Sequence, residues 1–162
     1  MSNVNESRPL AATPATAPRA PMAVQVLGYA GLVPFAAMAI IIAATGSSAS
    51  GVIRAEIAYG AAMLSFLGGA RWGMAIAAGG TQHLFRPLGL ATLPTLFASL
   101  VLFMPSPTAL VALIAGFVLL LIADRQDARA ERIASWYWSL RLTLTLLALV
   151  ALAISLCVVL LG

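Results

Sequence analysis

The stretch from Tyr59 to Gly73 reads YGAAMLSFLGGARWG, inside a largely apolar run over residues 53–78. Small residues recur in this run at every fourth position. The spacing lets a second helix pack closely in a lipid bilayer, where apolar burial offers no drive for helix association. We therefore predict a membrane-spanning helix with a helix-packing seam, called here the small-residue seam, made of Ala61, Ser65, Gly69, Gly73 and Ala77.

The composition of the whole chain indicates a membrane protein. Of its 162 residues, 62% are hydrophobic and 9% are charged, whereas about 25% of residues are charged in soluble domains. Its mean hydropathy is +1.01. So few charged side chains cannot cover a water-facing surface, and the long apolar runs favour helices. The predicted fold class is therefore all-α, an integral membrane bundle.

Five apolar runs are long enough to cross a bilayer, at a rise of about 1.5 Å per helical residue. We predict five transmembrane helices over residues 22–45, 53–78, 87–104, 107–123 and 137–161. The first is expected to be broken near Pro34. Residues 1–21, rich in Ala and Pro, are predicted to be a disordered tail. A cleavable signal peptide is the alternative for the first run, although that run exceeds the usual apolar length of about 7–15 residues.

The orientation follows from the arginines, because loops on the cytoplasmic side carry an excess of basic residues. If the N-terminus is cytoplasmic, only Arg54 lies near the outer face. The cytoplasmic side then holds Arg8, Arg19, Arg86, Arg125, Arg129 and Arg132. We therefore predict a cytoplasmic N-terminus and a C-terminus outside.

Charged and aromatic residues gather toward the cytoplasmic ends of three predicted helices. An arginine inside a spanning segment is costly and needs a partner or a water-filled cavity. Arg71 and Arg141 lie inside such segments, and Asp124 ends the fourth one. We predict a polar cluster that could contact a ligand or partner, made of Arg71, Trp72, Asp124, Tyr137, Trp138, Arg141 and Thr145.

A second interpretation of these residues stays open. The two arginines could extend to lipid headgroups, and the aromatic residues could belong to an interfacial belt. If they do cluster, one carboxylate between two guanidiniums leaves an excess positive charge, which an anion or a partner's carboxylate could meet.

The charges outside this cluster indicate surface positions. In the connection from Asp124 to Ser135, acidic residues form one stripe of a helix and basic residues another, so the acidic stripe is expected to face water or another protein. Glu56 is interpreted as an interfacial charge beside Arg54 in preference to a proton carrier, and His83 as a solvated loop residue.

Several classes of function find no support in the sequence. It shows no nucleophile with its base, no phosphate-binding glycine loop and no spaced set of metal ligands. We therefore expect no catalytic residues, no metal, no cofactor and no nucleic-acid partner, and the protein is not expected to be an enzyme. The expected partners are membrane lipids and a membrane protein.

The chain resembles a known family at particular residues. These are the stretch Tyr59–Gly73, the pair Leu93-Pro94, Asp124, and the stretch WYWSLRLTLT from Trp136 to Thr145. They are similar to the domain of unknown function 3429 family, the transmembrane-protein-69-like proteins. The resemblance implies a small multi-pass protein of a bacterial inner membrane and carries over no activity.

Two functional hypotheses follow. The preferred one is an accessory or assembly subunit that binds a larger membrane complex through the small-residue seam or the aromatic end of the last helix. The alternative is a carrier or binder of a small anionic or lipidic molecule, with Arg71 and Arg141 as its charged contacts.

Overall fold

The computed structural model describes residues 20–78 and 85–161 of the chain. In these two ranges all regular structure is helical, and no strand is present. The all-α fold class is thereby confirmed. The helices are α1 (Met22–Ala30), α2 (Val33–Thr45), the short 3-10 helix η2 (Gly46–Ser48), α3 (Ser50–Ala77), α4 (Phe85–Val101), α5 (Ser106–Arg129) and α6 (Ser135–Leu161).

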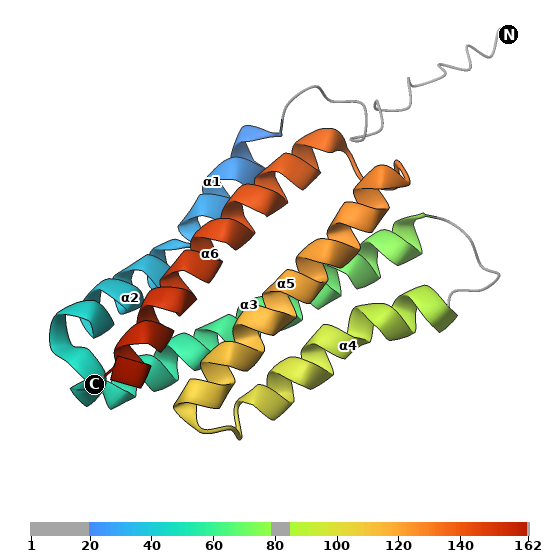
Figure 1. The fold of residues 1–162 in the computed structure, drawn as a ribbon. Helices are drawn as coiled ribbons and strands as arrows, with labels where there is room; N and C mark the ends of the chain where they lie inside the picture. The colour runs from blue at the N-terminus through green and yellow to red at the C-terminus, as the bar shows by residue number, and fades with distance from the viewer. Residues whose placement is uncertain (1–19, 79–84, 162) are drawn as a thin grey trace, which may run out of the picture.

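The helices run up and down in one bundle (Figure 1). α3 packs against α2, α4 and α5, while α6 packs against α5 and α2. The start of α1 and the end of α6 lie at opposite ends of the bundle (Figure 1). Nearly all of the predicted tail, as well as His83, lies outside the described residues.

Three segments are long and apolar enough to cross a membrane, namely 22–48, α5 and α6. α4 is apolar but has only 17 residues. α3 has 28 residues and includes Arg54, Glu56 and Arg71. α5 does not end at residue 123, as predicted, but continues to Arg129.

The first apolar run is interrupted between α1 and α2, at Gly31 and Leu32 rather than at Pro34. Pro34 instead lies in the first turn of α2, where its missing N–H has no intrahelical acceptor to lose. The Tyr59 hydroxyl of α3 donates a hydrogen bond of 2.8 Å to the Gly31 carbonyl. The Tyr59 ring also meets Phe35 edge-on, at 5.1 Å between centroids. Tyr59 thus satisfies a backbone carbonyl at the break, where lipid could not.

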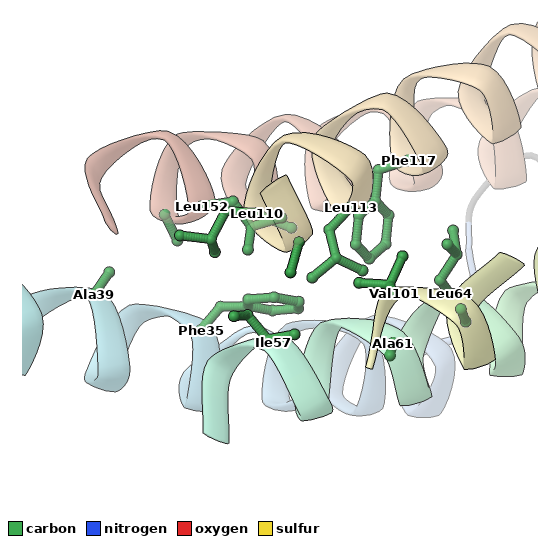
Figure 2. Packing of buried hydrophobic residues seen from close by; sticks show 14 of the residues in the cluster. Phe35, Ala39, Ile57, Ala61, Leu64, Val101, Leu110, Leu113, Phe117 and Leu152 are labelled. Atoms are coloured by element: carbon green, nitrogen blue, oxygen red, sulfur yellow. The ribbon is translucent and has the colours of Figure 1, made fainter. Parts of the chain in front are cut away.

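An apolar core fills the space between α2, α3, α5 and α6 (Figure 2). Leu110, Leu113 and Leu152 are fully buried there. The phenyl ring of Phe117 meets that of Phe35 edge-on, at 6.1 Å between centroids. Burial of these side chains against one another supplies the dispersion contacts that hold helices together in lipid.

Three glycines allow the close approach of α3 to its neighbours. A Cβ at Gly60 would lie 2.8 Å from Leu113 of α5, and one at Gly116 would lie 2.8 Å from Leu64. At Gly68 a Cβ would lie 2.8 Å from the backbone oxygen of Ala91 in α4. Ala61 is the residue of the predicted small-residue seam that is buried in the core beside these glycines.

Candidate functional site

The candidate site is built on the last turns of α5, which project two carboxylates from one face of the helix. Asp124 and Asp127 are three residues apart, the spacing that places side chains on the same side of a helix. Asp124 is only 1% exposed, whereas the side chain of Asp127 is 21% exposed. The continuation of α5 to Arg129 is what brings Asp127 into this position.

Arg141 of α6 holds the deeper carboxylate. Its Nε and Nη2 atoms donate to Oδ2 of Asp124 at 3.0 and 2.8 Å. The arginine is itself buried, at 7% exposure. Hydrogen bonds between ionised groups are among the stronger ones in proteins, and here they join α5 to α6.

Arg71 of α3 bridges the two aspartates. Its Nη1 donates to Oδ1 of Asp124 at 2.5 Å, and its Nη2 donates to Oδ2 of Asp127 at 2.7 Å. The planar fork of a guanidinium suits two acceptors placed side by side. The ion cluster, defined as Arg71, Asp124, Asp127 and Arg141, thus joins α3, α5 and α6.

The ion cluster contains two aspartates and two arginines, and the exposed Arg132 adds a third guanidinium at Asp127. The expected arrangement of one carboxylate between two guanidiniums left out Asp127, since the sequence interpretation ended the helix before it. The arginines point into the bundle instead of toward headgroups. Of the acidic stripe expected to face water or another protein, Glu131 is exposed, whereas Asp124 and Asp127 pair with arginines of the chain that compensate their charge.

A tight turn positions α6 for this cluster. The amide of Glu131 donates to the carbonyl of Ala128, and that of Arg132 to the carbonyl of Asp127, at 3.1 and 2.9 Å. This pair of bonds is a Schellman motif, which requires a left-handed residue after the helix. Glu131 takes that conformation, with φ 55°. The exposed side chain of Arg132 also donates to Asp127.

The other predicted cluster residues lie at different depths. The phenol of Tyr137 lies within electrostatic range of Arg141, Asp124 and Arg71, and Trp138 is half-buried nearby on α6. Thr145 is 2% exposed, and its hydroxyl has no hydrogen-bond partner. Trp72 is 44% exposed and points away from the bundle.

Residues 20–157 match a family model described as "Protein of unknown function (DUF3429)". The chain belongs to this family. Transmembrane protein 69 of Xenopus tropicalis is 39% identical over 140 residues, which cover 85% of this chain and 54% of that relative. The chain thus spans about half the length of the curated relative that it matches. No solved structure matches it. The resemblance predicted from the sequence is confirmed, and with the apolar helices it identifies a membrane protein of an uncharacterised family.

The small-residue seam of this DUF3429 chain divides along its length. Ala61 is buried, and Ser65 is half-buried. Gly69, Gly73 and Ala77 are exposed, and a Cβ at either glycine would meet open space. The part of the chain that the structure describes therefore leaves the second half of the seam uncovered, because α4 and α5 pack on the Gly60–Gly68 side of α3.

Glu56 is a buried residue that the sequence interpretation placed at the membrane interface. It is 0% exposed, and neither carboxyl oxygen has a hydrogen-bond partner. Its spacing from Ile53 and Gly60, three residues before and four after, places it on the same buried helix face. That periodicity was the sequence signal for its burial.

The described residues show no metal-binding cluster, and two apolar grooves lie on their surface. No group of three His, Cys, Asp or Glu side chains among them is arranged to hold a metal ion. Two open grooves on the surface, of about 400 and 350 Å³, run between α5 and α6 and between α2 and α6. Their linings are almost entirely apolar side chains, and neither groove is lined by a residue of the ion cluster.

Proposed function

We propose that this DUF3429 protein is an accessory or assembly subunit of a larger complex in a bacterial inner membrane. It binds a transmembrane helix of a partner protein through the open face of α3, defined as Phe66, Gly69, Trp72, Gly73 and Ile76. The observation that carries the proposal is the open space beside Gly69 and Gly73.

The open face has the shape that a partner helix needs. Gly69 and Gly73 lie one turn apart and create a shallow depression along the helix. The flanking side chains of Phe66, Trp72 and Ile76 are 66%, 44% and 49% exposed. A helix seated over the two glycines would bring its backbone close to α3 and gain dispersion contacts from the larger side chains on either side.

The ion cluster supports this function by holding the open face in place. Arg71 lies between Gly69 and Gly73 in sequence but points to the opposite side of α3, into Asp124 and Asp127. Because these bonds connect α3 to α5, and Asp124 connects onward to α6, α3 presents its outer face from a rigid support.

A topology with five spans is part of the proposal. The segment 22–48, α5 and α6 supply three of them, and α3 and α4 supply the other two. The pairing of Arg71 with two carboxylates lowers the cost of placing a charged residue within a spanning α3. The excess of arginines near the start of α1 and the end of α5 favours a cytoplasmic location for that end of the bundle.

The carrier hypothesis has less support. Both guanidiniums that would bind an anion already donate to aspartates within the chain. A ligand anion would have to displace a buried carboxylate, leaving that carboxylate without its partner. The apolar grooves lie elsewhere and bring no cation to a ligand.

The test is native electrophoresis of the tagged protein after mild extraction from its own membrane, with mass spectrometry of the co-migrating proteins. The double variant Gly69→Leu with Gly73→Leu fills the depression. Gly89→Leu is the matched control, because Gly89 is an exposed glycine on α4 with equally open space. Thermal unfolding of each purified variant reports whether it folds.

We expect the wild type and Gly89→Leu to migrate with a larger complex in fixed ratio, and the folded double variant to migrate alone. Retention of the complex by the folded double variant would overturn the open face as the binding surface. A wild-type chain that runs alone with a co-purified anionic molecule would replace the proposal by the carrier hypothesis.

A further inference from the structure

Glu56 is a carboxyl group enclosed by the bundle at the end opposite to the ion cluster. It lies six residues from the first residue of α3, about 9 Å along the helix. Its side chain is 0% exposed, and both oxygens lack a hydrogen-bond partner. The fully buried Ser155 hydroxyl of α6 lies beside the same carboxyl, although the pair as placed does not meet the geometry of a hydrogen bond.

No cation in the described ranges reaches this carboxyl. α2 carries no charged residue, and the charged residues of α4 and α5 lie at the other end of the bundle. On α6, Arg141 is 14 residues from Ser155, about 21 Å along the helix, and Cys157 is exposed.

The ionisable neighbours on α3 itself are engaged elsewhere. Arg54 is exposed, and its Nη1 donates to the Met104 carbonyl at 3.5 Å. The Tyr59 hydroxyl donates to the Gly31 carbonyl. Within the described ranges Glu56 therefore has no counter-charge, and the neutral Ser155 hydroxyl is the donor that faces it.

A carboxylate in such surroundings carries an energetic cost that a neutral acid avoids. Burying an ionised carboxylate without a partner is so unfavourable that the group takes up a proton instead. The neutral acid also gains an O–H donor, and the Ser155 hydroxyl can accept from it after a side-chain rotation. The Ser155 hydroxyl can also donate to an ionised carboxylate, but it brings no counter-charge, so the buried pair is better satisfied when a proton is present.

We propose that Glu56 and Ser155 form a proton-binding site, in which the Glu56 carboxyl holds a proton and exchanges it with water at the end of the bundle where α3 begins. A metal cation is a poorer occupant, because hard cations take about six or more oxygen ligands. This site is separate from the open face of α3, so the inference does not depend on the proposed function.

Proton release has a structural consequence. The carboxylate left behind would need water or further donors, which the packed interior around Glu56 lacks. Separation of the helices around Glu56 at this end of the bundle would admit that water. The packing of these helices is therefore expected to depend on whether the proton is bound.

The test is infrared spectroscopy of the full chain in lipid vesicles, which detects the carbonyl stretch of a protonated carboxylic acid. The band is measured for the wild type, Glu56→Gln, Ser155→Ala and Glu131→Gln. Glu131→Gln is the matched control, because Glu131 is an exposed carboxylate at the other end of the bundle. Each sample is measured in ordinary water and after transfer to heavy water.

We expect a carboxylic-acid band in the wild type and Glu131→Gln that is lost in folded Glu56→Gln. Ser155→Ala should shift the band, because the hydrogen bond to the hydroxyl is gone. Heavy water should shift the wild-type band as the proton is replaced by a deuteron.

Two results would overturn the proposal. The first is the absence of a carboxylic-acid band in the folded wild type, since Glu56 would then be ionised. The second is a band that never shifts in heavy water, because the site would then not exchange its proton. Should Glu56→Gln fail to fold, the presence and the heavy-water shift of the wild-type band decide the same question.

Discussion

Arg141 and Asp124 form an ion pair in the interior, with two nitrogens of the arginine donating to one oxygen of the aspartate at 3.0 and 2.8 Å. The two residues are 17 positions apart, on α6 and α5. The other oxygen of Asp124 accepts from Arg71 of α3. A single carboxylate therefore fixes three helices against one another near one end of the bundle.

Asp124→Asn should be strongly destabilising. It removes the charge that two arginines share, and loss of one partner from a buried ion pair costs about 3–5 kcal/mol. The free energy of unfolding in detergent checks this value. Arg132→Ala is the control, because its side chain is 72% exposed and an exposed pair contributes about 1 kcal/mol or less. Equal losses in the two variants would contradict the central role of Asp124.

The neighbouring glycines Gly68 and Gly69 should respond differently to the same substitution. Gly68→Ala forces a Cβ to within 2.8 Å of the Ala91 backbone oxygen, and such overpacking costs about 1–3 kcal/mol. Gly69→Ala enters open space and should leave the protein unchanged or slightly more stable, since alanine favours helices. Thermal unfolding of the two variants tests the difference, and a similar loss in both would contradict the described packing of α3.

Tyr59→Phe removes only the hydroxyl that binds the Gly31 carbonyl at the break between α1 and α2. We expect a loss of about 0.5–1.5 kcal/mol, the usual contribution of one hydrogen bond. Tyr29→Phe is the matched control, because Tyr29 is 46% exposed. Unfolding experiments compare the two, and hydrogen exchange at the start of α2 should increase in Tyr59→Phe alone. An unchanged exchange rate would show that the hydroxyl does not secure the break.

Glu131→Gly should stabilise the protein. A residue with a side chain is strained at φ 55°, whereas glycine is the usual residue at this position of a Schellman motif. We expect a gain of about 0.5–1 kcal/mol. Ala130→Gly is the control, since its φ of -86° is ordinary, and it should give no gain. A loss of stability in Glu131→Gly would contradict the assigned turn.

Much of the architecture can be predicted from local sequence. Apolar runs of sufficient length indicate helices in lipid whatever surrounds them, so the all-α class, the family and the approximate helix positions follow from the residues alone. Candidates for interior charges were equally visible, because Arg71, Asp124 and Arg141 stand out in segments that otherwise carry almost no charge. Asp127 was missed as a partner of Arg71, because its position depends on where α5 ends.

Which helices and charges contact one another, and which face each helix turns inward, could be determined only from the tertiary structure. Periodicity marks which residues share a helix face, but α3 has small residues on two faces, and only the positions of α4 and α5 show that Gly60 and Gly68 are covered while Gly69 and Gly73 are open. The pairing of the charged residues also follows only from the tertiary structure. The partners of Arg71 are more than 50 residues away in sequence, and the isolation of Glu56 results from the absence of any counter-charge on the helices packed around it. Local patterns can set where helices form, because backbone hydrogen bonding in lipid is satisfied within each helix, whereas the rotation of each helix depends on long-range contacts that no single segment contains.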